Sequence, residues 1–179
     1  MIDWLRQLVA RLSGTADVPT DFPGSLDAEE QVLAVAKTAE GALVATHLGL
    51  WLPEGRRLGW HLLSKATWNN GVLTVIEAEE AGAAGDAVLL RDLPGRRLEL
   101  TGSSRLPDVV HERVNQSIRS RHHRDLPGGG AWFVQRKVPG RDGIVLQVRP
   151  DRGADEAAVT EFAATVAERL QQAKGPERD

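Results

Sequence analysis

Cysteine and tyrosine are absent from this chain of 179 residues, and methionine occurs only once. The absence of cysteine excludes disulfides, thiolate metal sites, iron–sulfur clusters and cysteine nucleophiles, and it fits a reducing compartment. The absence of tyrosine removes phenolic acid–base catalysis. With only three phenylalanines in the chain, the five tryptophans have to supply much of the aromatic bulk of the core.

Long apolar runs and a surplus of positive charge are missing as well. No window approaches the roughly 18 apolar residues that a membrane-spanning helix needs. Residues 1–12 lack the continuous apolar stretch of a signal peptide, so we expect a cytoplasmic protein. The net charge of −3 disfavours non-specific nucleic-acid binding, because that mode needs a basic surplus.

The N-terminal segment has the pattern of a short amphipathic helix. Apolar residues at helical spacing predict a helix over residues 2–13, and the proline- and glycine-containing residues 14–25 predict a linker. The helix either packs on the domain or binds a membrane surface or a partner. We expect a single α+β domain over residues 26–174 and a frayed tail over residues 175–179.

Hairpin signals dominate the first half of that domain. Turn residues such as Asn70-Gly71 separate short apolar runs, which is typical of an antiparallel meander and not of a nucleotide-binding α/β fold. The predicted strands are residues 32–37, 43–52, 58–68, 72–78, 87–91 and 98–100.

Helical periodicity appears in the second half. It predicts helices over residues 106–120 and 156–173, the second capped by Asp155, with a hairpin of residues 131–138 and 144–148 between them. Phe162, Val166 and Leu170 should be buried against the sheet. We therefore expect an antiparallel β-barrel or strongly bent sheet, with a C-terminal capping helix and an extra helix before the last hairpin.

Two resemblances support this outline. Residues 42–51, the turn at Pro53 and the run 58–68 resemble an early hairpin of bacterial PH-like domains, which implies a small barrel closed by a helix. Residues 59–68 and 134–140 resemble a family of proteins from GC-rich Gram-positive bacteria that carries no assigned activity. The predicted helix 106–120 departs from a simple PH-like barrel, and no ligand is implied.

Charge is unevenly distributed, and this is the main functional signal. Residues 112–152 contain nine Arg or Lys against four Asp or Glu, whereas acidic residues gather between Glu77 and Asp92. The two patches either face each other or form separate surfaces, and the second case would attract an anionic partner such as an acidic protein or a lipid headgroup. The residues predicted to form an exposed anion-binding surface are Arg119, Arg121, His122, His123, Arg124, Arg136 and Arg141.

Signals for catalysis and metal binding are weak. His47 and His61 fall on predicted strands but lack a third ligand, and arginines around His122-His123 would repel a metal ion. Gly128-Gly129-Gly130 precedes a strand and so lacks the context of a phosphate-binding loop. No serine lies in a nucleophile elbow.

We therefore predict no catalytic residue, metal or cofactor, and interpret the chain as a binding or adaptor module with a basic surface. The alternative is an enzyme or small-ligand protein with a site between the sheet and helix 106–120. Trp51, Trp60, Trp68 and Trp132 are interpreted as core or core-edge residues, and stacking on nucleic-acid bases is the other interpretation.

Overall fold

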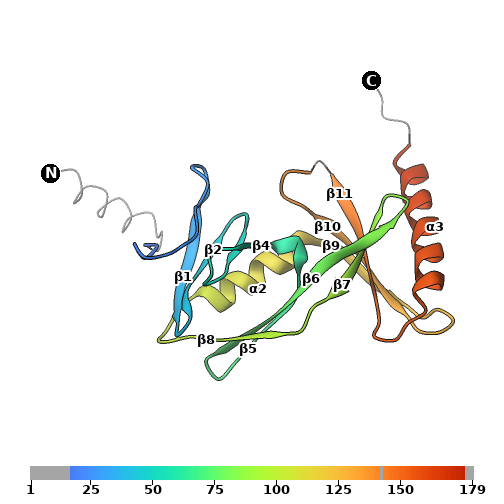
Figure 1. Cartoon of the computed structure of the whole chain (residues 1–179). Coiled ribbons are helices and arrows are strands. Elements are labelled where there is room, and N and C mark those ends of the chain that lie inside the picture. The colour runs from blue at the N-terminus through green and yellow to red at the C-terminus, as the bar shows by residue number, and fades with distance from the viewer. Residues whose placement is uncertain (1–16, 142, 176–179) are drawn as a thin grey trace. The chain divides into compact units, whose positions relative to one another are not determined.

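The computed structural model describes residues 17–141 and 143–175, so the predicted helix 2–13 lies outside the described residues. The chain is an α+β protein built mostly of antiparallel strands (Figure 1). Where the sequence suggested one domain, the described residues group into two compact units. The first comprises residues up to 77 together with 94–115, and the second comprises residues 78–93 together with those from 116 onward.

The first unit contains two antiparallel sheets. Strands β1 to β4 form one sheet in chain order, and in the other β6 lies between β5 and β8. The bounds are β1 Val32–Thr38, β2 Gly41–Thr46, β3 Gly49–Trp51, β4 Arg57–Gly59, β5 Leu63–Asn69, β6 Val72–Ala84 and β8 Arg96–Glu99.

Two of the predicted strands are interrupted by hydrogen bonds that the sequence pattern did not reveal. The run 43–52 is broken because the Thr46 hydroxyl accepts the backbone N–H groups of Leu48 and Gly49, which reverses the chain between β2 and β3. The run 58–68 is broken by the 3₁₀ helix η1 (Trp60–Leu62), where the Trp60 indole N–H donates to the Thr46 carbonyl at 3.1 Å.

The predicted hairpin at Asn70-Gly71 is confirmed. Both residues have positive φ angles, 48° and 79°, as a turn that follows the twist of its strands requires. Beyond it, β7 (Ala87–Asp92) and then β8 pair in succession along β6. They are separated at residues 93–95, where Pro94 has no backbone N–H to continue a ladder.

Helix α2 (Leu106–Ser117) covers the core of the first unit. Leu106, Val109 and Val110 are buried among residues of β1 to β6 and β8, and Val114 packs beside them. The meander is thus capped by α2 and not, as the sequence suggested, by the C-terminal helix. The helix predicted over 106–120 ends at Ser117, where β9 (Ile118–Arg124) begins.

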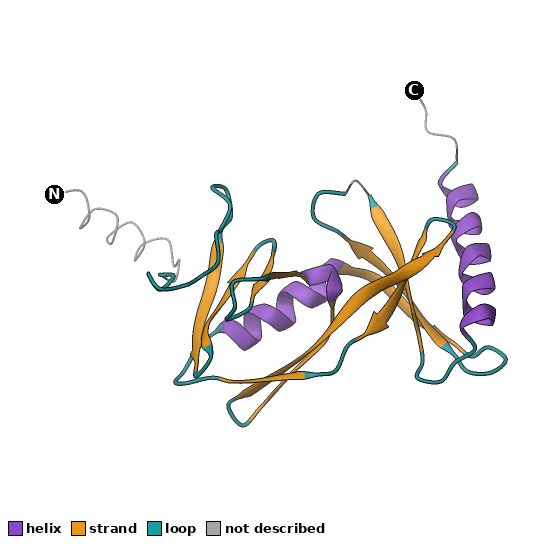
Figure 2. Ribbon diagram, viewed as in Figure 1, coloured by secondary structure: helices purple, strands orange, loops and turns teal. Residues whose placement is uncertain are grey.

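The second unit is a sheet covered by the C-terminal helix (Figure 2). Its strand order is β6, β7, β11, β10, β9, with the residues after Glu77 of β6 at one side. The predicted hairpin is confirmed as β10 (Ala131–Lys137) and β11 (Ile144–Pro150). The one parallel pairing among the described strands joins β11 to β7, through Gln147 beside Val88 and Val148 beside Leu89.

Helix α3 (Glu156–Lys174) packs on this sheet through small residues. Asp155 is the predicted N-cap, and its carboxylate accepts the N–H groups of Ala157 and Ala158 at 3.0 and 3.2 Å. The fully buried face consists of Val159, Ala163 and Ala167.

The larger side chains predicted to be buried, Phe162, Val166 and Leu170, are only half-buried beside that face. Phe162 meets Phe133 edge to face at 5.4 Å. Large side chains flank the contact because alanines beneath the helix axis allow α3 to approach the sheet closely.

Enlarging Ala163 tests this close approach. Ala163→Leu should lower the free energy of unfolding by about 1–3 kcal/mol, because three extra carbon atoms have no space beneath the helix. Ala157→Leu, on the exposed side of the same helix, should stay within about 0.5 kcal/mol. Urea unfolding of the two variants measures both values, and equal losses would contradict the packing described here.

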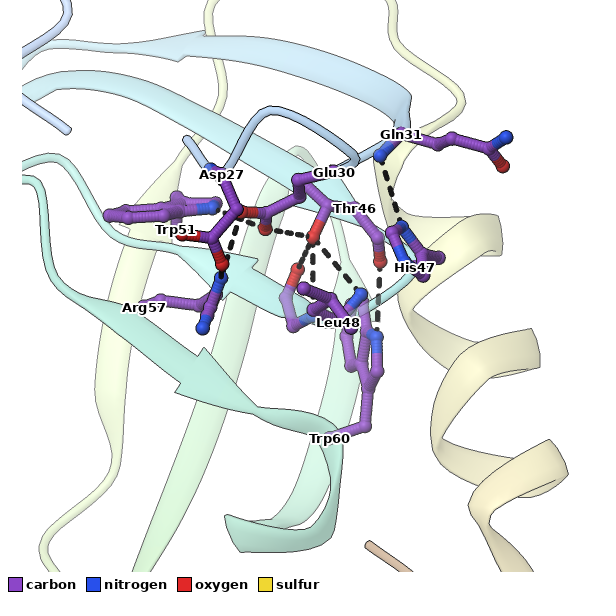
Figure 3. Close-up of polar contacts among 10 residues, drawn as sticks. Asp27, Glu30, Gln31, Thr46, His47, Leu48, Trp51, Arg57 and Trp60 are labelled. Carbon is purple, nitrogen blue, oxygen red and sulfur yellow. Dashed lines mark hydrogen bonds and ion pairs between the residues drawn. The ribbon is translucent and has the colours of Figure 1, made fainter. Parts of the chain in front are cut away.

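A buried carboxylate closes the irregular segment 17–31 onto the first unit (Figure 3). The Glu30 side chain is 0% exposed and accepts hydrogen bonds from the Thr46 hydroxyl, the Trp51 indole N–H and the Arg57 guanidinium. It also accepts the backbone N–H of Asp27 at 3.2 Å. Every donor comes from the same unit, so the network fixes the chain that precedes β1 across β2, β3 and β4.

Opposing effects act on the pKa of Glu30. Burial by itself raises it, but the hydrogen bonds from Thr46, Trp51 and Asp27 and the positive charge of Arg57 together lower it below its ordinary value. The unfolded chain therefore binds this proton more readily. The contribution of the network to stability is complete above the unfolded pKa of about 4.3 and is lost as the pH falls through the folded pKa.

Glu30→Gln should lower the free energy of unfolding by about 1–3 kcal/mol at neutral pH, because it removes the charge that three donors and Arg57 share. The variant should also lose part of the fall in stability between about pH 5 and pH 3. Urea unfolding across that range measures both effects. The exposed neighbour Glu29 provides a matched control, and Glu29→Gln should leave both quantities nearly unchanged.

Candidate functional site

The basic segment 119–124, whose first two residues fall within the predicted helix 106–120, forms strand β9. It pairs along its length with β10, from Arg124 beside Ala131 to Ile118 beside Arg136, with an irregularity at Arg119. Such long-range pairing overrides the weak strand propensity of a run of arginine and histidine. β9 is the last strand of the sheet order, so only one of its edges is paired within the described structure.

The pleat of β9 places cationic side chains on both faces of the sheet. Arg121 and His123 lie opposite Val134 and Trp132, whereas His122 and Arg124 lie opposite Phe133 and Ala131. Phe133 and Ala131 belong to the core beneath α3, so His122 and Arg124 extend from that face at the sheet edge. Five exposed residues make up what we term the β9 surface: Arg119, Arg121, His122, His123 and Arg124.

Trp132 contacts Arg121 and His123 on one face of the sheet. The Arg121 guanidinium lies 5.8 Å from the Trp132 ring centroid, and the His123 ring meets the same indole edge to face at 5.2 Å. His123 is held further by Asp151, whose carboxylate lies 2.7 Å from Nε2, and by Asp125 at 3.6 Å from Nδ1. These contacts hold Arg121 and His123 in defined positions on the strand.

The three arginines of the β9 surface are not neutralised internally. No acidic side chain in the described part of the chain lies within ion-pair distance of Arg119, Arg121 or Arg124. Their charges are therefore available to a partner.

The acidic segment 77–92 pairs elsewhere. Its ion pairs join Glu77 to Arg56, Glu79 to Arg91, Glu80 to Arg141, and Asp92 to Arg149. In the described part of the basic stretch, Arg141 and Arg149 thus form ion pairs with the acidic segment. Intramolecular ion pairs therefore compensate the negative charges of the acidic segment at Glu77, Glu79, Glu80 and Asp92. They do not compensate the positive charges of β9.

Arg136 and Arg141 do not join the predicted surface. Arg136 is only 4% exposed, and burial, reinforced by the positive charge of Arg149, lowers its pKa to about 10. Alternation along β10 places Arg136 on the same face as Val134 and Arg121. Its side chain is nevertheless buried on a strand that lies between β9 and β11, which the charge pattern alone could not show. Arg141 is exposed in the turn after β10, 3.9 Å from Glu80, at the opposite end of that strand from Arg124.

A second candidate site lies between α2 and the strands β5 and β6. The alternative interpretation of the sequence placed a small-molecule site in this region, between the sheet and the predicted helix 106–120. It is a shallow groove of about 300 Å³ lined by residues of β5, β6 and α2: Ala66, Thr67, Trp68, Leu73, Pro107, Asp108 and His111. Trp68 is 47% exposed, in contrast to the buried Trp51 and Trp60. Of the four tryptophans interpreted as core, Trp68 is the one whose indole is available to a ligand.

No sequence motif marks the residues of this groove. Its only indication was a large aromatic residue two positions before the Asn70-Gly71 turn, where hairpin ends are usually solvated. His111 lies 3.0 Å from the Asn115 amide, one turn further along α2.

The histidines and glycines singled out from sequence have structural positions. His47 lies in the β2–β3 turn, where Nδ1 accepts the Gln31 N–H at 3.0 Å, and His61 lies in η1, so the two do not form a strand pair. The described residues contain no group of three or more metal-ligating side chains. Gly128 approaches Asp155 so closely that an added Cβ would lie 2.9 Å from the Asp155 Cβ.

None of the described helices is long and apolar enough to cross a bilayer. Comparison of the chain with protein-family models, with curated proteins and with solved structures yields no match. The function therefore has to be inferred from the two candidate sites.

Proposed function

We propose that this chain is a non-catalytic binding module whose β9 surface binds an anionic partner. The observation that carries the proposal is the exposure of Arg119, Arg121 and Arg124 without an ion pair in the described structure. Positive charges gathered on one strand repel one another, and an anion relieves that repulsion. Guanidinium groups also match the geometry of carboxylates and phosphates.

A local positive surface is compatible with the overall charge of −3. Association depends on the potential at the site of approach, so three uncompensated arginines attract an anion despite a net negative chain. Non-specific nucleic-acid binding remains the weaker proposal, because it draws on a broad basic surplus.

We also propose a PH-like fold for the first unit and a cytoplasmic location. The succession of strands β1 to β6 and β8, followed by a helix that covers their core, supports the resemblance seen in the sequence. The cytoplasmic location is supported by the lack of cysteine.

Charge reversal on β9 tests the anionic-partner proposal. The variant Arg119→Glu/Arg121→Glu/Arg124→Glu should bind labelled poly-L-glutamate and phosphatidylserine vesicles at least about tenfold more weakly than the unmodified protein. Binding by the unmodified protein should weaken about tenfold between roughly 50 and 300 mM salt, because exposed charges are screened.

The control carries the same change of charge at three exposed arginines away from β9, as Arg97→Glu/Arg105→Glu/Arg169→Glu. It should retain most of the affinity. Equal losses in the two triple variants would indicate a response to net charge alone, and salt-independent binding would contradict the proposal.

The second candidate function is binding of a small apolar ligand in the groove beside α2. It is favoured by the exposed indole of Trp68, which is the cross-strand partner of the buried Leu73, and by Pro107 of α2 among the lining residues. Sites for small molecules are characteristically concave and largely apolar, with a few polar groups at the edge, here Asp108 and His111.

Substitution of Trp68 tests the groove. The neutral fluorophore N-phenyl-1-naphthylamine should bind the unmodified protein, and Trp68→Ser should weaken that binding about fivefold or more, because the largest apolar wall is lost. The β9 triple variant should bind the fluorophore normally, since its substitutions lie outside the groove. Unchanged affinity in Trp68→Ser would exclude the groove as the binding site.

A further inference from the structure

The unpaired edge of β9 offers backbone groups as well as charge. We propose that β9 binds an extended acidic peptide segment as an additional strand of the sheet. This inference rests on the proposed function and deepens it, because it specifies both the partner class and the mode of binding.

The backbone of β9 has unpaired hydrogen-bonding groups along one edge. In an antiparallel pair, alternate residues direct their N–H and C=O groups away from the partner strand. β9 pairs with β10 on one side, and no backbone hydrogen bond on its other side occurs among the described residues. An edge of this kind is a template for another extended chain, and peptide recognition by strand addition uses it.

The side chains of β9 give this edge a positive charge. An arginine lies on each face of β9, with Arg121 and His123 on one face and Arg124 and His122 on the other. Residues of an added strand would stand directly beside them, where opposite charges stabilise a pair and like charges destabilise it. A segment with aspartate or glutamate at every second position or more therefore matches this edge.

The same charges disfavour the other strands that could pair here. A second copy of β9, added antiparallel about its centre, would set Arg121 beside its own counterpart and His123 beside Arg119. An apolar strand would leave the cations without partners. Charged residues on an edge strand commonly prevent aggregation in this way. On β9 the positive charges disfavour pairing with basic or apolar strands and so favour an acidic strand.

A lipid surface would pair with fewer of the polar groups on the β9 edge than a peptide would. Headgroup phosphates would meet the guanidinium groups, but they would not continue the ladder of backbone hydrogen bonds. An acidic peptide satisfies both features, and the observations on β9 therefore favour it.

N-methylated peptides separate strand addition from charge attraction. The probe is a labelled peptide of about ten residues that alternates glutamate and valine, long enough to cover β9. One derivative carries N-methyl groups only on the glutamates, so it blocks a single edge of the peptide. The other carries the same number of N-methyl groups, divided equally between glutamates and valines, so it blocks both edges.

We expect the peptide blocked on one edge to bind within about threefold of the unmodified peptide, because its other edge can still pair with β9. The peptide blocked on both edges should bind at least about tenfold more weakly, because neither edge can form a ladder. Hydrogen exchange should show new protection at alternate amides within residues 118–124. The triple variant Arg119→Glu/Arg121→Glu/Arg124→Glu should lose binding of the unmodified peptide.

Each other outcome overturns a defined part of the argument. Equal binding of the two methylated peptides, with loss in the triple variant, would overturn strand addition and leave the anion-binding proposal intact. Binding to phosphatidylserine vesicles but not to the peptide would overturn the peptide partner in favour of a lipid headgroup. If poly-L-glutamate, vesicles and peptide all fail to bind, the proposed function itself is wrong.

Discussion

The backbone hydrogen bonds of β6 are the constraint on which the rest of the structure depends. Its first residues pair with β5 on one edge and β8 on the other, and its residues after Glu77 pair with β7. Strand β7 in turn lies beside β11, and β10 and β9 follow. One continuous strand therefore contributes to the sheets of both compact units, and the position of β9 at an edge follows from the order of strands that begins there.

Charged side chains in this chain occupy two different environments. The carboxylate of Glu30 is buried and accepts hydrogen bonds from Thr46, Trp51, Arg57 and Asp27, so its charge is fully compensated within the first unit. The guanidinium groups of Arg119, Arg121 and Arg124 are exposed and form no ion pair in the described structure. The first arrangement stabilises the fold, whereas the second leaves electrostatic energy to be gained by binding.

The β9 surface also depends on precise support from its neighbours. Pairing with β10 aligns β9, Trp132 contacts Arg121 and His123, and Asp151 orients the His123 ring. A flexible loop with the same residues would lose more conformational entropy on binding than a strand already aligned by its partner. Strand formation in this segment, which the sequence pattern did not predict, therefore favours binding.

Local patterns in the sequence sufficed for the α+β class, the Asn70-Gly71 hairpin, the β10–β11 hairpin and the Asp155 cap. Each depends on neighbouring residues alone, through turn conformation, alternation or capping. The same reasoning predicted the basic residues of segment 119–124 and, as an alternative, a site beside the helix expected over 106–120, since charge and amphipathic spacing are also readable locally.

Long-range pairing and packing decided the remainder. β6 continues through Glu79-Glu80 to Ala84 because β7 pairs with it, although charged and small residues there predicted an earlier end. β9 is a strand because β10 lies beside it, and α2 rather than α3 covers the meander because the apolar stripe of α2 meets that core. Arg136 is buried and Arg121 exposed, although both lie on the face of Val134, because β10 is an inner strand and β9 an edge strand. That order exists only once the strands have paired.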